Sequence, residues 1–93
     1  MDWRSEENKM LIQAILAIKT EEEAEHFLRD LMTENEITEF GKRLQTAVML
    51  TRKNSYSAIA QKTGLSSTTI ARVAKWLHGK GGGYRAIINK IGH

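Results

Sequence analysis

The sequence predicts an all-α chain of about six helices that contains a helix-turn-helix. The 93 residues include no proline, apolar residues recur at helical spacing through most of the chain, and the glycines gather mainly near its C-terminal end. At this length we expect a single domain over residues 1–93. A domain of this size has a thin core unless a second chain adds to it.

The first two helices are marked by their capping residues. Ser5 can cap a first helix that runs to about Ile18, and Thr20 with Glu23 has the pattern of a capping box for a second. The apolar face of this second helix is formed by Ala24, Phe27, Leu28 and Leu31.

The first helix is apolar on every side. Its apolar residues are Met10, Leu11, Ile12, Ala14, Ile15, Leu16, Ala17 and Ile18. A helix that is hydrophobic all round has to be buried all round. We therefore expect a second copy of the chain to bury it, with Leu11, Ile15 and Ile18 in a shared dimer core. A helix at the centre of a monomeric bundle is the alternative.

The third helix is the longest of the series. Thr33 with Glu36 repeats the capping pattern, and the helix is expected to run to about Arg52 or Lys53. One face of it carries Ile37, Phe40, Leu44, Ala47, Val48 and Thr51. A polar joint over residues 53–55 follows. After Gly79 and the glycines at 81–83, a short last helix is indicated by Tyr84, Ile87, Ile88 and Ile91.

The helix-turn-helix is expected over residues 56–77. Ala60 is small where two helices cross, Gly64 supplies a left-handed backbone at the turn, and Ile70 fills the space between the helices. Either Ser66 or Ser67 can cap the second helix. The rest of the inner face is formed by Ile59, Leu65, Val73 and Leu77.

The charges are divided sharply along the chain. All 11 carboxylates precede residue 40, and residues 40–93 carry ten Lys and Arg side chains with no acid. The segment up to Glu39 has a net charge of −7, because only four cations offset its 11 carboxylates, and the remainder has +10. Such a cationic half favours a polyanionic partner, and a solvated basic surface is the simpler alternative.

We therefore interpret the chain as a partner of double-stranded DNA. The predicted base-reading face of the second hairpin helix consists of Ser66, Ser67, Thr68, Thr69, Arg72 and Lys75. The predicted phosphate contacts are Arg52, Lys53, Ser57 and Lys62. A module that docks on an acidic subunit of the transcription machinery through the same basic half is the competing hypothesis.

Other functions find little support in the sequence. Without cysteine there is no thiol catalysis, and His26, His78 and His93 lack metal-ligand spacing, so we expect neither an enzyme nor a metal site. The three histidines are expected on the solvent side, and Trp76 is expected to seal the second hairpin helix against a neighbour. No apolar run reaches the length of a membrane span, and no signal peptide is evident, which predicts a cytoplasmic protein.

Three segments resemble the Trp-repressor family, in particular its YerC/YecD-type branch: residues 31–36, residues 40–44, and the hairpin from Ala60 to Arg72 with Thr-Ile preceding the arginine. The similarity spans about Leu28 to Tyr84. It implies a six-helix chain whose N-terminal helices interlock with those of a second chain, as an intertwined homodimer. It also implies repression at operators with two-fold symmetry.

The resemblance further implies an effector site at Thr33, Arg43 and Arg72, which match polar contacts of the family's tryptophan co-repressor. The chain departs from the pattern directly after Arg72, where Val73 replaces a glycine and Trp76 follows one turn later. These side chains fill space that an indole needs. We therefore expect DNA binding without a cofactor or effector. Another small anionic or amino-acid ligand is the next alternative, and tryptophan is the least expected.

Overall fold

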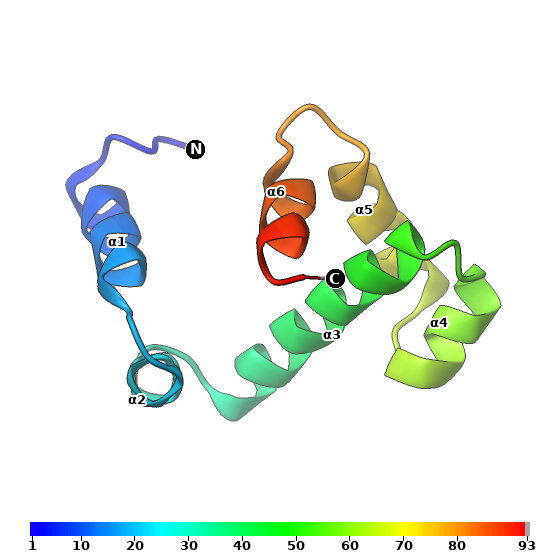
Figure 1. Cartoon of the computed structure of the whole chain (residues 1–93), viewed down its shortest axis with the longest axis horizontal. Helices are drawn as coiled ribbons and strands as arrows, with labels where there is room; N and C mark the ends of the chain where they lie inside the picture. Colours follow the sequence, from blue (N-terminus) through cyan, green and yellow to red (C-terminus); the bar gives the residue numbers. More distant parts are fainter. Residues whose placement is uncertain (93) are drawn as a thin grey trace. The chain divides into compact units, whose positions relative to one another are not determined.

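The computed structural model describes residues 1–92, so the expectation for His93 lies outside the described residues. Every regular element in this range is helical, which confirms the all-α prediction (Figure 1). The helices are α1 (Glu6–Ala17), α2 (Glu21–Leu31), α3 (Glu34–Thr51), α4 (Tyr56–Thr63), α5 (Ser67–Leu77) and α6 (Gly83–Lys90).

The chain divides into two compact units, an N-terminal unit (Met1–Glu34) and a C-terminal unit (Asn35–His93). The expectation of a single domain stays a prediction.

Helices α1 and α2 of the N-terminal unit begin as their capping residues predict. The Ser5 hydroxyl accepts a hydrogen bond from the Asn8 N–H at 3.3 Å, and the Thr20 hydroxyl accepts one from the Glu23 N–H at 3.1 Å. The Glu23 carboxylate in turn accepts a hydrogen bond from the backbone of Lys19. Neither helix buries a single residue within the chain, and Leu16 is 77% exposed. Much of the apolar surface of α1 therefore stays exposed.

Helix α3 ends in a turn that has a lysine where glycine is usual. The Asn54 N–H donates to the Met49 carbonyl at 3.1 Å, and the Lys53 N–H donates to the Leu50 carbonyl at 3.0 Å. This pair of bonds is the Schellman motif, which needs a left-handed residue after the helix. Lys53 takes that place with φ 67°, the one non-glycine residue with positive φ among residues 1–92.

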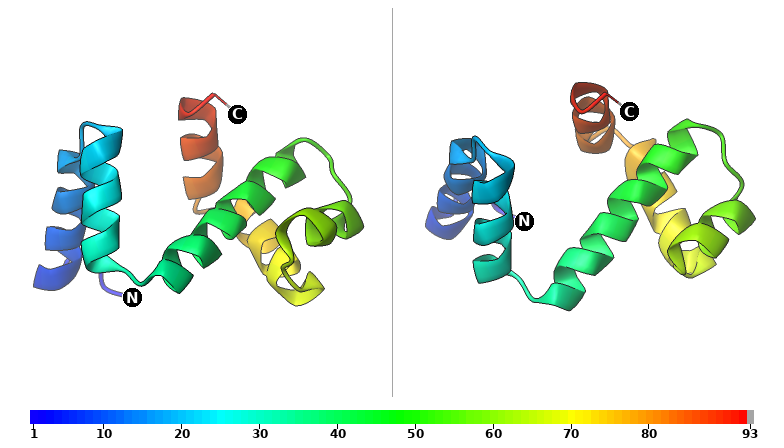
Figure 2. Two further views of the ribbon diagram at one scale, coloured as in Figure 1. Left: turned by 90° about the horizontal axis from the view of Figure 1, so that it is seen from below. Right: turned by 60° about the horizontal axis from the view of Figure 1, so that its bottom comes forward.

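The core of the C-terminal unit lies between α3, α5 and α6. Figures 1 and 2 show the three shorter helices gathered along the second half of α3. The buried cluster consists of Ala47, Val73, Leu77 and Ile88, with Val48, Leu50 and Tyr84 packed against it. Ile59 of α4 and Ile70 of α5 are fully buried, as the helix-turn-helix pattern predicts. The first half of the predicted α3 face is open instead, since Phe40 and Leu44 are exposed.

A single arginine ties α6 to the end of α5. The Arg85 guanidinium donates hydrogen bonds to the carbonyls of Leu77 and Gly79, the second at 3.1 Å. These carbonyls lie at the C-terminal end of α5, where a cation also interacts favourably with the helix dipole. The left-handed Gly82, with φ 70°, then starts α6. Arg85 thus fixes the C-terminal end of the second hairpin helix.

Candidate nucleic-acid interface

Three local features shape the helix-turn-helix: the cap at the start of α4, the glycine turn after α4 and a buried threonine beside that turn. Ser55 caps α4 by accepting from the Ala58 N–H at 3.1 Å. Gly64 takes φ 76°, and its N–H donates to the Ala60 carbonyl at 2.8 Å. The buried Thr63 hydroxyl donates to the carbonyl at position 59 at 2.8 Å and accepts from the backbone N–H at position 65. Gly64 was predicted from the sequence, and the part played by Thr63 was not.

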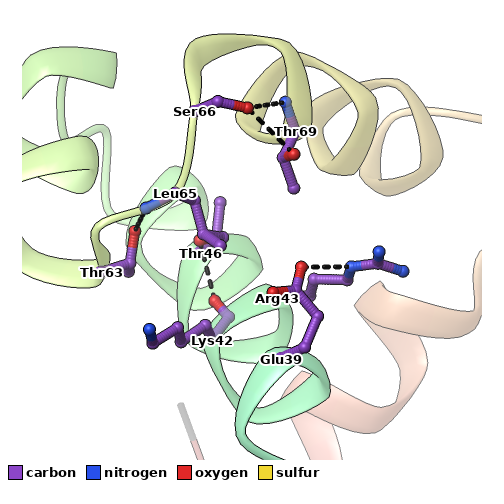
Figure 3. A network of polar contacts seen from close by, with 8 residues as sticks. All are labelled: Glu39, Lys42, Arg43, Thr46, Thr63, Leu65, Ser66 and Thr69. Carbon is purple, nitrogen blue, oxygen red and sulfur yellow. Dashed lines mark hydrogen bonds and ion pairs between the residues drawn. The ribbon is translucent and has the colours of Figure 1, made fainter. Parts of the chain in front are cut away.

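Helix α5 starts at a pair of hydroxyls that bond to each other. The Ser66 hydroxyl accepts from the Thr69 N–H at 3.2 Å and donates to the Thr69 hydroxyl at 3.1 Å (Figure 3). Ser66 is therefore the cap, and Ser67 is the first helical residue. Because both hydroxyls serve the start of the helix, the first turn is held in one conformation.

The remaining predicted base-reading residues lie on the open side of α5. Ser67, Thr68, Arg72 and Lys75 are exposed, opposite the buried stripe of the helix. The side chains of these four residues make no hydrogen bond or ion pair within residues 1–92. They are available to a ligand without first breaking an intramolecular contact.

The predicted phosphate-binding residues flank α4. Arg52 and Lys53 lie where α3 ends, Ser57 lies in the first turn of α4, and Lys62 lies in its last turn. All four residues are exposed. The C-terminal unit has ten cations and two carboxylates, a net charge of +8, and the N-terminal unit has four cations and nine carboxylates, a net charge of −5. The helix-turn-helix therefore lies in the strongly cationic unit.

Arg43, a residue of the predicted effector site, is already engaged within the chain. Its Nε lies 3.3 Å from the Glu39 carboxylate (Figure 3). Its guanidinium lies 5.6 Å from the centre of the Phe40 ring. Arg72 is on α5 of the same unit, and Thr33 belongs to the N-terminal unit. The three-residue effector site stays a prediction.

Trp76 is placed differently from the sequence expectation. We expected its ring to seal α5 against a neighbouring helix, but the residue is 64% exposed. The reason is helical geometry: the inward positions of α5 are taken by Ile70, Val73 and Leu77, and Trp76 lies beside this stripe rather than on it. Its ring borders a groove that is lined by Leu44, Trp76, Tyr84 and Ile87 and by the glycines at 81–83.

Neither a metal site nor a membrane span is indicated over residues 1–92. No group of three or more His, Asp or Glu side chains in this range is placed to hold a metal ion, and His26 and His78 are exposed as expected. None of the described helices is both long and apolar enough to cross a bilayer.

The fold and this surface define the class of the protein: a helix-turn-helix protein with the architecture of a DNA-binding regulator. The family model for the Trp repressor protein matches residues 6–91. The chain belongs to the Trp repressor family. This match includes α1, which contributes little to the resemblance seen in the sequence.

Individual relatives agree with this assignment over nearly the whole chain. The uncharacterized protein YerC of Bacillus subtilis is 36% identical over 88 residues, which are 95% of this chain and 85% of YerC. The crystal structure of a TrpR-like protein from Eubacterium eligens superposes with a TM-score of 0.89 at 37% identity, covering 97% of this chain and 93% of that one. The structure of a candidate Trp repressor from Staphylococcus aureus gives 0.87 at 35% identity, covering 98% and 94%.

Proposed function

We propose that the protein is a sequence-specific transcriptional repressor that binds an operator of two-fold symmetry as a homodimer. The observation that carries this proposal is the exposed face of α5. The second helix of a helix-turn-helix presents unpartnered hydroxyl and cationic side chains, in a chain that has no carboxylate after Glu39. A face of this kind is complementary to the edges of bases and to phosphates.

The likeness to other helix-turn-helix proteins suggests how each element contacts DNA. Helix α5 enters the major groove with its N-terminal turn foremost, so that Ser67 and Thr68 meet base edges and the longer cations reach guanine or phosphate. Lys53 and Lys62, at the two ends of α4, hold the sugar-phosphate backbone. In a dimer, the two helix-turn-helix units would contact half-sites that lie about one turn of the DNA helix apart.

A titration of DNA under varied salt, followed by in vitro selection of bound sequences, tests the proposal. Affinity for any duplex should fall steeply with salt, because phosphate contacts release counterions, and selection should return a two-fold symmetric site. Absence of binding even at low salt would favour docking on an acidic protein. Binding without any sequence preference would contradict the repressor proposal.

We further propose that operator binding requires no tryptophan. Two features support this: the Arg43 guanidinium already pairs with Glu39, and Val73 is buried at 3% exposure in the core where a smaller residue would leave room. Trp76 lends no support in the single chain, since its ring is exposed. Calorimetry with L-tryptophan, beside operator binding with and without it, decides the point. Measurable heat together with tryptophan-dependent affinity would contradict this proposal.

A further inference from the structure

Helix α5 lacks the side chains that usually read two of the four DNA bases. Residues 65–77 include no Asn, Gln, Asp or Glu. In the major groove, Asn and Gln bind adenine through two hydrogen bonds, and Asp and Glu accept a hydrogen bond from the amino group of cytosine. The one amide side chain of the helix-turn-helix, Gln61, lies on α4, the helix that crosses the phosphate backbone in such motifs. The bases read by α5 are therefore expected to be guanine and thymine.

The part of a recognition helix that contacts base edges is its N-terminal part. The exposed residues in the first two turns of α5 are Ser67, Thr68, Ala71 and Arg72. Lys75 lies in the last turn, farther from this end of the helix. Among the four exposed residues, Ala71 is apolar and Arg72 is charged, so each of these two presents a different chemical group to the bases.

Ala71 presents a methyl group where the neighbouring side chains are short. Ser67 and Thr68 precede it by four and three residues, so they lie beside it on the helix surface. Because none of these three side chains is long, the helix can approach the base pairs closely at this point. The C5 methyl of thymine is the apolar group that base edges present in the major groove, and an alanine methyl is one of its usual contacts.

Arg72 presents the one guanidinium of α5, and this group makes no hydrogen bond or ion pair within residues 1–92. Arg43 and Arg85 of the same unit are engaged, the first with Glu39 and the second with the carbonyls at the end of α5. A guanidinium donates several hydrogen bonds in a planar fork and accepts none. Guanine is the base whose major-groove edge presents two acceptors, N7 and O6, so it is the base that this fork matches.

We propose that, in each half-site of the operator, α5 reads a guanine through Arg72 and the methyl group of a thymine through Ala71. This inference rests on the proposed repressor function, and it specifies which bases the recognition helix contacts. The cytosine and adenine opposite these bases are then specified by base pairing alone. Ala71 is thereby added to the predicted DNA contacts.

Base analogues placed in a selected operator test the thymine contact. Each thymine of a half-site is replaced in turn by uracil, which keeps every hydrogen-bonding group and lacks the methyl. At one position this change should lower the affinity of the unmutated protein about fourfold, as expected for one buried methyl group. Ala71→Ser replaces the protein's methyl with a polar group and should bind the two operators equally. An effect of uracil on DNA shape would persist in this variant, so the comparison isolates the contact.

The guanine contact is tested with 7-deazaguanine, which lacks the N7 acceptor. At one guanine of the half-site this analogue should lower the affinity of the unmutated protein at least about fivefold, and Arg72→Ala should bind both operators equally weakly. Lys62→Ala, which removes a predicted phosphate contact, is the matched control. It should lower the affinity for all of these operators by the same factor and leave both base preferences unchanged.

The outcomes separate this inference from the repressor proposal. Loss of each base preference in its own variant supports the inference. A selected operator that tolerates both analogues without loss of affinity overturns it, while the repressor proposal stands. A uracil penalty that persists in Ala71→Ser also overturns it and leaves Ala71 as a helix-forming residue only. Loss of base preference in Gln61→Ala would assign the reading to α4, against the inference. If selection returns no preferred site at all, the repressor proposal fails and the inference fails with it.

Discussion

At the scale of single residues, the structure separates side chains that stabilise the start of α5 from side chains that can contact DNA bases. Ser66 and Thr69 were both expected to face DNA, but their hydroxyls bond to each other and to the start of α5. Thr68 and Arg72 have no such bonds within residues 1–92. Base reading is therefore expected to depend on the second pair more than on the first.

Thr68→Ala and Arg72→Ala should weaken binding to a selected operator by about 1 to 3 kcal/mol each, as for side chains that contact base edges. Neither residue is buried, so the circular dichroism and melting temperature should stay unchanged. Ser66→Ala is the contrasting variant: it removes the cap and should lower stability by about 1 kcal/mol. If Thr68 and Arg72 can both be replaced without loss of affinity, α5 is not the reading helix.

Lys53 offers a second residue-scale prediction, because its backbone is left-handed. A left-handed L-residue costs about 1 to 2 kcal/mol, and glycine in place of another residue costs about 0.5 to 1 kcal/mol through the unfolded chain. Lys53→Gly should therefore raise the free energy of unfolding by about 0.5 kcal/mol. If Lys53 also contacts phosphate, the same change should flatten the log-log salt dependence of DNA binding by about 0.9.

The control for Lys53 is Lys62→Ala, at the other end of α4. Lys62 lies within the helix, so its replacement should reduce the salt dependence without any gain in stability. If Lys53→Gly stabilises the protein but leaves the salt dependence of DNA binding unchanged, Lys53 does not contact phosphate.

At the scale of elements, the position of α5 depends on the turn at Gly64 and on the hydrogen bonds of Arg85. Gly64 sets the direction in which the chain leaves α4, and Arg85 donates to the last carbonyl of α5 and to the Gly79 carbonyl in the turn that follows. Helix α5 is thus constrained at both ends, at its start by the Gly64 turn and at its end by α6.

Gly64→Ala should lower the free energy of unfolding by about 1 to 2 kcal/mol, because alanine is strained at φ 76°. Nothing lies within 4 Å of the added Cβ, so the cost comes from the backbone and not from a clash. Gly64→Asn should be milder, since asparagine tolerates the left-handed region. Thermal melts of the two variants check the order, and equal losses would point to a steric cause.

At the scale of the whole molecule, the prediction of a dimer rests on the exposed apolar surface. Ile15 is 50% exposed in the single chain and lies on the helix that no part of its own unit buries. Leu11 is likewise exposed, and Ile18 is half-buried. The place of these three residues in a dimer core stays a prediction, because the structure leaves them exposed or half-buried.

Ile15→Asp should unfold the protein, because a dimer would place this carboxylate without a partner in its shared core. In a monomer the same change would fall on a half-exposed site and cost little. Gln13→Asp, on the same helix, is the control for charge alone and should stay folded. Sedimentation of the unmutated protein as a folded monomer would contradict the dimer.

The sequence by itself determined the helices, their caps, the turn at Gly64 and the division of charge, because these depend on local steric rules and on the order of residues along the chain. The family could be identified from it for the same reason. Only the tertiary structure decided that Ser66 rather than Ser67 caps α5, that Arg43 pairs with Glu39, and that the Trp76 ring stays exposed. The Ser66 cap and the Arg43–Glu39 pair are local choices among alternatives that the sequence leaves open. The exposure of Trp76 depends on which faces of α3, α5 and α6 meet, and helical periodicity alone cannot specify how helices pack.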